Sequence, residues 1–255
     1  MTTSRERAGL LCLPYAGGSA RIYRRWSEEL GPSIEVVPLE PAGRGTRFGE
    51  PFPTSIAAAV HDLQRRAAPA IRGKYALFGH SMGALLAWEL ARALVSASLP
   101  PPEQLFLSGK PPPHVVPRRP VHALPEAEFL RSVAAMGGTP REVLENDELM
   151  QIFLPVLRAD YRMTETYAPR SEVDPLDCGI TFFFATADPT LSRDQVEGWR
   201  RYTRGEFRIL DHEGGHFFLL EKGRELAREM RHVLGRPEST RPAPMFVEAG
   251  DRVEV

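Results

Sequence analysis

The chain has 255 residues, of which 42% are hydrophobic and 25% charged, a balance typical of one ordinary globular domain. The formal net charge of -1 offers no electrostatic reason to expect binding to nucleic acid or to an anionic membrane. Two cysteines, Cys12 and Cys178, are too few for a disulfide framework or a metal cluster, and their apolar neighbours predict core positions. No apolar run approaches the roughly 18 residues of a membrane span, and the polar start lacks the features of a signal peptide. We therefore expect a cytoplasmic protein.

Short apolar runs alternate with longer amphipathic segments, which predicts an α/β domain with a mostly parallel sheet flanked by helices. The runs that we expect to form strands are 9–14, 34–39, 75–79, 104–108, 180–186 and 206–210. The segments that we expect to form helices are 22–30, 55–71, 82–97, 193–202 and 223–234.

Residues 111–176 break this alternation. The segment opens with prolines and then becomes helical in character over 126–136, 141–145 and 147–166, with no strand-like run. An all-helical insertion between two strands predicts a lid, and a lengthened crossover that only packs on the sheet is the alternative. Residues 1–236 would form one domain that carries this insertion. Residues 237–255, rich in proline and charge, predict a flexible tail.

The most informative motif is Gly79-His80-Ser81-Met82-Gly83. A strand-like run precedes it and a long helical segment follows it, which is the strand–turn–helix setting of a strained nucleophile elbow. Side chains at positions 79 and 83 would collide if the turn closed so tightly, which explains both glycines. A serine that merely begins a helix would not require them. Ser81 is therefore the predicted nucleophile.

A serine needs a base within hydrogen-bonding reach, and in this setting the chain order is Ser, then Asp or Glu, then His. Three histidines follow the insertion: His212, His216 and His232. His216 comes after two glycines, just past the last predicted strand, and is the predicted base. His212 on the same loop is its rival, while His232 is expected on the surface of the final helix.

The acid that orients the base should follow the strand predicted at 180–186. Asp188 stands there and would hold the imidazole in the correct tautomer. Asp174 and Asp177 precede that strand and would emerge at the wrong edge, and Asp194 falls on the following helix, where an exposed first-turn acid is expected. The alternative for Asp188 is a simple turn residue before proline.

Two backbone N–H groups should stabilise the developing oxyanion. One is expected from Met82, the residue after the nucleophile. The loop 14–18 follows the first predicted strand and should supply the other, from Ala16, with Tyr15 as the alternative. Gly17-Gly18 lacks the further glycines or the lysine of a phosphate-binding loop. The histidines and acids lack the spacing of metal ligands, so no metal is expected.

Seven short segments of the sequence match one known family: 13–19, 41–47, 78–83, 107–113, 136–140, 154–161 and 214–219. The chain resembles the type II thioesterases that accompany nonribosomal peptide and polyketide synthases, within the α/β-hydrolase superfamily. The resemblance runs over about residues 9–234 and includes the insertion. Ala42 departs from the family's Pro-Gly-Arg-Gly loop, although Gly43-Arg44-Gly45 remains.

The resemblance implies an α/β-hydrolase fold with a helical lid, and it places the catalytic triad on Ser81, Asp188 and His216. It also implies hydrolysis of mischarged or stalled acyl groups from the phosphopantetheine arm of a synthase's carrier domain. That arm belongs to the partner, so no cofactor of the protein's own is implied. We expect a monomer whose partners are acyl-loaded carrier domains, without nucleic acid or membrane.

Within the insertion, the apolar residues Phe129, Met136, Phe153 and Leu157 could shape an acyl pocket or form the lid's own small core. Arg118 and Arg119 could meet the acidic surface of a carrier domain or form a solvated charged turn.

Three other functions remain open at this stage. An acyltransferase or cyclase would use the same acyl-serine with an amine or alcohol in place of water, and product analysis would separate it from a hydrolase. A non-catalytic protein that only binds acyl carriers would not react at Ser81 with a fluorophosphonate probe. A generic lipase or esterase would prefer oxygen esters.

Overall fold

A six-stranded, all-parallel sheet forms the centre of the molecule, with the strand order β2-β1-β3-β4-β5-β6. The computed structural model describes residues 7–116, 120–138, 146–169 and 174–235. The strands are β1 (Ala8–Leu13), β2 (Ile34–Pro38), β3 (Tyr75–His80), β4 (Gln104–Ser108), β5 (Gly179–Ala185) and β6 (Phe207–His212). All six predicted strands are confirmed to within one or two residues at each end.

The helices of the described chain fall between these strands. The α-helices are α1 (Ser27–Leu30), α2 (Ile56–Ala67), α3 (Met82–Ser96), α4 (Glu126–Ala134), α6 (Asp147–Glu165), α7 (Arg193–Glu197) and α8 (Leu219–Leu234). The 3₁₀ helices are η1 (Ala20–Trp26), η2 (Gly45–Arg47), η3 (Ala68–Ala70) and η4 (Gly198–Tyr202). The short helix predicted at 141–145 lies outside the described residues. No helix in the described part of the chain is long and apolar enough to cross a membrane.

The helix expected at 22–30 is the clearest departure from the sequence-based prediction, because most of it is the 3₁₀ helix η1 and only Ser27–Leu30 is α-helical. The residues that η1 buries are Ala20, Tyr23 and Trp26, which are spaced by three. A 3₁₀ helix has three residues per turn and stacks such residues along one side. Packing against the sheet therefore decides the tighter helix here.

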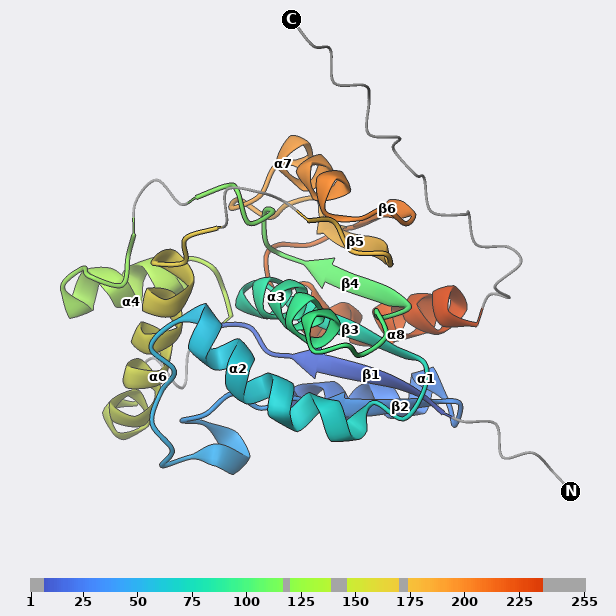
Figure 1. Ribbon diagram of the computed structural model, residues 1–255. Helices are drawn as coiled ribbons and strands as arrows, with labels where there is room; N and C mark the ends of the chain where they lie inside the picture. Colours follow the sequence, from blue (N-terminus) through green and yellow to red (C-terminus); the bar gives the residue numbers. More distant parts are fainter. Residues whose placement is uncertain (1–6, 117–119, 139–145, 170–173, 236–255) are drawn as a thin grey trace, which may run out of the picture.

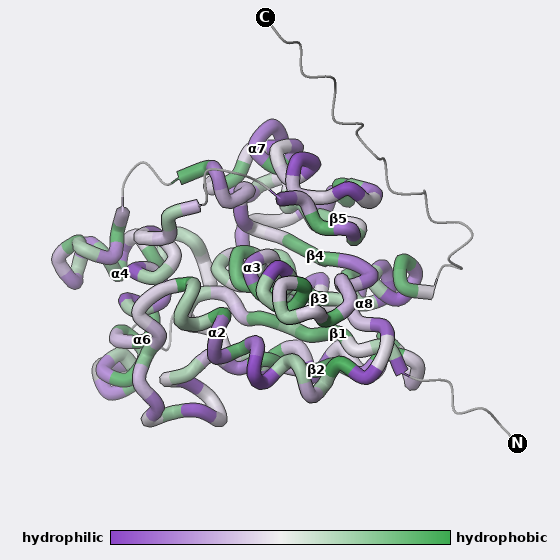
Figure 2. The backbone as a smooth tube through the Cα atoms, in the orientation of Figure 1, coloured by the Kyte–Doolittle hydropathy of each residue, from purple (hydrophilic) through white to green (hydrophobic). Residues whose placement is uncertain are grey.

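Helices cover both faces of the sheet, and successive strand residues pack on opposite faces (Figure 1). Leu11 and Leu77 belong to the core under α2 and α3, whereas Leu10 and Phe78 belong to the core under η1 and α8. Both cysteines are buried, as predicted. Strands covered on both faces are expected to be apolar throughout. Figure 2 shows this as hydrophobic colour along β1 and β4 at the centre of the molecule.

Helices α4 and α6 gather at one end of the sheet, the end toward which the arrows of β1 and β4 point (Figure 1). They come from the segment between β4 and β5, so a helical insertion stands at the carboxyl edge of the parallel strands. A small core of Phe129, Val133 and Leu157 holds the two helices together. Arg118, Arg119 and the predicted tail at 237–255 lie outside the described residues.

Candidate active site

Ser81 occupies a sharp turn between β3 and α3, as the motif predicts. Its backbone has φ 54° and ψ -119°, a conformation that residues other than glycine rarely adopt. The Ser81 N–H donates to the Ser108 carbonyl at 2.8 Å, and the Ser81 carbonyl accepts from the Ala84 N–H at 2.9 Å. Strand β4 and the first turn of α3 therefore hold the serine in a strained position.

The two glycines of the motif have the steric role predicted for them. A Cβ atom on Gly79 would lie 2.0 Å from the Gly83 carbonyl oxygen. A Cβ atom on Gly83 would lie 2.4 Å from the Leu13 carbonyl oxygen, at the end of β1. Both distances are far shorter than any real contact of a Cβ atom, so the elbow closes only with glycine at these positions.

An imidazole–carboxylate pair lies at the same edge of the sheet. Asp188 follows β5 and His216 follows β6, and the two strands are neighbours. His216 Nδ1 lies 2.7 Å from Asp188 Oδ2, and both side chains are almost fully buried. The other carboxylate oxygen, Oδ1, accepts from the Thr190 N–H at 2.9 Å and from the Thr190 hydroxyl at 2.7 Å. Nothing in the sequence singled out Thr190.

Burial alone would raise the pKa of the Asp188 carboxyl, but the hydrogen bonds from His216 and Thr190 outweigh it and hold this pKa below its ordinary value. A carboxylate that accepts at His216 Nδ1 requires a proton on that nitrogen, so the neutral ring presents Nε2 as an acceptor. Among the described residues His216 Nε2 has no partner, and it is buried. Ser81 and His216 line the same cavity. The Ser81–His216 hydrogen bond is not formed in this structure, and such bonds commonly tighten only when substrate is bound.

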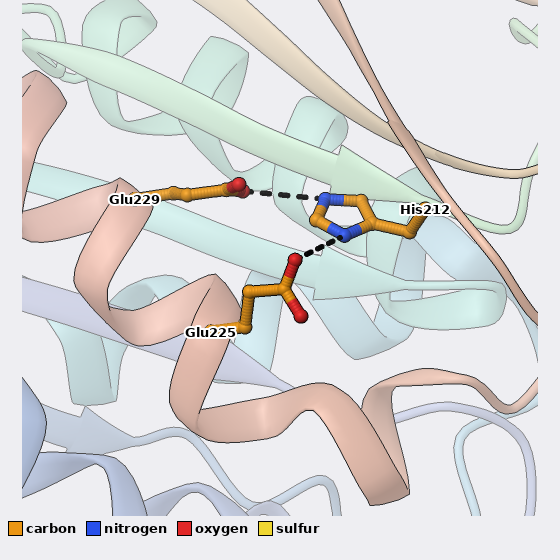
Figure 3. A group of neighbouring side chains, drawn as sticks. All are labelled: His212, Glu225 and Glu229. Atoms are coloured by element: carbon orange, nitrogen blue, oxygen red, sulfur yellow. Dashed lines mark ion pairs between the residues drawn. The ribbon is translucent and has the colours of Figure 1, made fainter.

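His212, the rival base, is held elsewhere. Its two ring nitrogens lie 3.5 Å from Glu225 Oε1 and 3.2 Å from Glu229 Oε2, both on α8 (Figure 3). The two carboxylates approach different ring nitrogens from the side of α8 (Figure 3). One ligand atom from each of the three residues lies within 4.8 Å of the other two, a grouping that the spacing along the sequence did not indicate. His232 is exposed on α8, as expected. The structure thus brings His216, and not His212, to Asp188.

The remaining acidic candidates also lie where the sequence predicts. Asp174 and Asp177 pair with Arg204 before β5. Asp194 is exposed in the first turn of α7.

Two backbone N–H groups of the loop after β1 already donate hydrogen bonds within the protein. Gly18 N–H donates to the Tyr15 carbonyl at 2.9 Å, and Gly17 N–H donates to Asp160 Oδ2 at 2.8 Å. Within the described chain, the N–H groups of Tyr15 and Ala16 have no such acceptor. Ala16 and Met82 line the cavity that also contains Ser81 and His216, which is the place required of oxyanion donors.

His80 is a further buried group that the sequence did not assign. Its Nδ1 lies 2.5 Å from Ser108 Oγ, and its ring centroid lies 4.9 Å from that of His216. Burial and the neighbouring His216 hold the pKa of His80 well below its ordinary value, so the ring is neutral. His80 therefore forms an uncharged wall behind the His216 imidazole.

The candidate site opens into a cavity of about 730 Å³ that reaches from Ser81 to the insertion. A separate narrow pocket beside Ser81 is lined by Met136, Phe153 and Leu157, among others. Phe129 is fully buried in the insertion's own core, where Leu157 also packs. Phe129 thus belongs to the insertion's own core and Met136 lines the site, whereas Phe153 and Leu157 take part in both.

Comparison with known proteins shows the family to which this chain belongs. Residues 8–234 match the model of the thioesterase domain family. The chain belongs to the thioesterase domain family. Thioesterase PikA5 of Streptomyces venezuelae is 38% identical over 237 residues, which are 92% of this chain and 83% of PikA5. Linear gramicidin dehydrogenase LgrE of Brevibacillus parabrevis is 38% identical over 228 residues, which are 88% of this chain and 86% of LgrE.

Among solved structures, ClbQ from the colibactin NRPS/PKS pathway superposes on this thioesterase with a TM-score of 0.86 at 34% identity, covering 90% of this chain and 98% of ClbQ. The type II thioesterase BorB from the borrelidin biosynthetic cluster matches with a TM-score of 0.81 at 33% identity, covering 89% of this chain and 93% of BorB. These two similarities confirm the α/β-hydrolase fold and the resemblance to type II thioesterases noted in the sequence.

One cationic side chain of this thioesterase lies in the wall of the cavity. Lys110 follows β4 and Gly109, and the Lys110 carbonyl accepts from Trp199 Nε1 at 2.9 Å, which fixes the backbone there. Burial lowers the pKa of Lys110 to about 8. Lys110 therefore places an ionisable group in the lining of the cavity, and the sequence analysis gave this residue no role.

Proposed function

We propose that this protein hydrolyses acyl thioesters from the phosphopantetheine arm of carrier domains in nonribosomal peptide or polyketide biosynthesis, with Ser81, His216 and Asp188 as its catalytic triad. The observation that carries the proposal is the 2.7 Å His216–Asp188 pair, whose imidazole lines the same cavity as the strained Ser81. The related PikA5 is named a thioesterase, and ClbQ belongs to an NRPS/PKS pathway.

In the first half of the reaction, Ser81 Oγ attacks the thioester carbonyl carbon while His216 Nε2 takes the hydroxyl proton. Asp188 holds the imidazolium that forms. The carbonyl oxygen becomes an oxyanion, which accepts hydrogen bonds from the N–H groups of Ala16 and Met82. The carbon–sulfur bond then breaks, and the pantetheine thiol leaves with the proton from His216.

In the second half, water enters the cavity and His216 takes one of its protons. The hydroxide attacks the acyl-Ser81 carbonyl, the oxyanion forms again, and the bond to Ser81 Oγ breaks as His216 returns the proton. The products are a free acid and regenerated enzyme. In the proposed reaction the nucleophile, the base, the orienting acid and the oxyanion donors all come from this protein. The pantetheine arm belongs to the partner carrier domain.

The helical insertion is proposed as the lid of this site. Its residues Met136 and Tyr161 line the cavity together with Ser81 and His216. A cavity of about 730 Å³ lies in the range of ordinary small-molecule sites, which is adequate for an acyl chain and part of a pantetheine arm. We also propose that the protein acts as a cytoplasmic monomer, without nucleic acid or membrane as a partner.

The test offers acyl-loaded carrier domains beside matched acyl-CoA and oxygen-ester substrates. We expect the highest kcat/KM for the carrier-bound thioesters and no hydrolysis by the Ser81→Ala variant. Preference for the oxygen esters would overturn the proposed substrate class. Fluorophosphonate labelling of the wild type, but not of Ser81→Ala, measures the nucleophile separately from the substrate.

A further inference from the structure

A buried carboxylate outside the proposed triad joins three separate segments. Asp160 lies on α6, and its side chain is 1% exposed. Its Oδ2 accepts from the Gly17 N–H at 2.8 Å and also from Arg44 Nη1, while its Oδ1 accepts from Arg44 Nη2 at 2.6 Å. The insertion, the loop after β1 and the loop after β2 therefore meet at one side chain.

Burying the Arg44 and Asp160 charges at this junction carries a large desolvation free energy. The Arg44 side chain is 4% exposed, and its Nε is buried with no partner in the described chain. Removing two charges from water can offset most of their mutual attraction, so a buried ion pair is weak evidence of a stabilising role. What such a pair does provide is a defined geometry, because the two parallel hydrogen bonds from Nη1 and Nη2 restrict how the guanidinium and the carboxylate lie relative to each other.

The geometry fixed here is that of the proposed oxyanion loop. Gly17 N–H is held by Asp160 on one side of Ala16, and the Tyr15 carbonyl is held by Gly18 N–H on the other. The loop is also pressed against α6, since a Cβ atom on Gly17 would lie 2.6 Å from Leu157 Cδ2. The Tyr15 carbonyl and the Ala16 N–H belong to one planar peptide unit, which the Gly18 N–H holds, and Asp160 holds the next unit through the Gly17 N–H. Because the two units are joined at the Ala16 Cα atom, the bond to Asp160 restrains the rotation that would turn the Ala16 N–H away.

We propose that Asp160 is a positioning residue that orients the Ala16 N–H for the oxyanion, so that the oxyanion hole is complete only while α6 is seated on the loop. This inference rests on the proposed function. Arg44 acts one step further out, because it holds the Asp160 carboxylate in place. An insertion that both encloses the acyl group and orders an oxyanion donor links closure of the site to its reactivity.

Two double variants separate this role from simple stability. Arg44→Gln/Asp160→Asn removes both charges but keeps an amide oxygen that can accept from Gly17 N–H. Arg44→Met/Asp160→Leu removes both charges and that acceptor, with apolar groups of similar size. Asp62→Asn serves as a control, because it breaks an ion pair of the buried Arg47 without contacting the loop at 14–19.

The measurements are kcat and KM for an acetyl N-acetylcysteamine thioester, the inhibition constant of an alkylboronic acid, and Tm. The boronic acid forms a tetrahedral adduct with Ser81 and places an oxygen where the oxyanion develops. Losing a single oxyanion donor lowers kcat by about 10²–10³-fold, so a misplaced donor is expected to lower it by about 10–100-fold.

For Arg44→Met/Asp160→Leu we expect kcat to fall by about 10–100-fold and the inhibition constant of the boronic acid to rise by the same factor. Its KM should stay within about threefold of the wild-type value. We expect Arg44→Gln/Asp160→Asn and Asp62→Asn to retain kcat within about fivefold, whatever happens to their Tm. Equal kcat values for the two folded double variants would overturn the positioning role. A wild-type protein that labels at Ser81 but leaves the thioester intact would instead overturn the proposed function, and this inference with it.

Discussion

Asp188 and His216 are 28 residues apart in the chain, yet their side chains meet at 2.7 Å because they follow neighbouring parallel strands. Each strand ends at the same edge of the sheet, and each loop needs only a few residues to return to it. Thr190, two residues after Asp188, satisfies the carboxylate oxygen that His216 does not use. The pair is therefore positioned by the sheet and oriented by its own loop.

We expect Asp188→Asn to lower kcat by about 10³–10⁴-fold, because an amide can donate to Nδ1 and so stabilise the wrong tautomer of His216. The measurement is steady-state hydrolysis of an acyl N-acetylcysteamine thioester. Thr190→Val is the matched variant, since it removes the hydroxyl donor and leaves the backbone N–H donor to Asp188. Its kcat should fall by less than about tenfold. An Asp188→Asn enzyme with near-normal kcat would remove Asp188 from the triad.

Gly109→Ala should disturb the wall behind His216. Gly109 has φ 64°, and a Cβ atom there would lie 2.4 Å from Cε1 of the His80 ring. Gly137→Ala is the control, because Gly137 has φ 79° but nothing within 4 Å of the added atom. Chemical denaturation should show a loss of about 1 kcal/mol for Gly137→Ala from backbone strain alone. The loss for Gly109→Ala should be about 2–4 kcal/mol, with a lower kcat. Equal losses would mean that the His80 ring moves freely.

The partly buried ammonium of Lys110 should make stability depend on pH. Its pKa is about 8 in the folded protein and near 10.5 when unfolded, so the unfolded chain binds more protons between these values. Wild-type stability from this group should therefore rise with pH across that window. At pH 7, Lys110→Met should be more stable than wild type by about 1–2 kcal/mol, and the gap should shrink by pH 10. Urea unfolding at the two pH values measures the difference.

Lys222→Met is the control for that series, because the Lys222 ammonium pairs with Glu225 on the surface of α8. Its effect should be small at both pH values. A gap for Lys110→Met that stays constant with pH would mean that Lys110 is not desolvated in the folded protein.

Enlarging the narrow pocket should change the acyl preference. Met136 and Phe153 line the pocket of about 20 Å³ beside Ser81. We expect Phe153→Ala to raise the ratio of kcat/KM for octanoyl over acetyl thioesters by about tenfold, since each buried methylene contributes to discrimination. Phe129→Leu is the control, because Phe129 packs in the insertion's core and not in this pocket. It should lower Tm and leave the ratio unchanged, and a changed ratio there would count against this assignment of the pocket.

The sequence by itself determined the groups with a local signature. The elbow at Ser81 follows from two glycines between a strand pattern and a helix pattern, and Asp188 follows from its place after an apolar run. The four central strands β1, β3, β4 and β5 are almost wholly buried, and such parallel strands are continuous apolar runs, which explains why they were predictable. The edge strands β2 and β6 are only partly buried, yet short apolar runs marked them as well. The family resemblance also came from short motifs that lie close to the proposed catalytic groups.

Only the tertiary structure decided the choices that depend on distant contacts. The sequence places His212 and His216 on one loop, but His212 is the last residue of β6 and pairs with Glu225 and Glu229 on α8, which leaves His216 to Asp188. The 3₁₀ form of η1, the separation of Phe129 from the pocket and the junction at Asp160 arise in the same way. Each depends on side chains that are brought together by packing of the sheet, its helices and the insertion, and no spacing along the chain records such contacts.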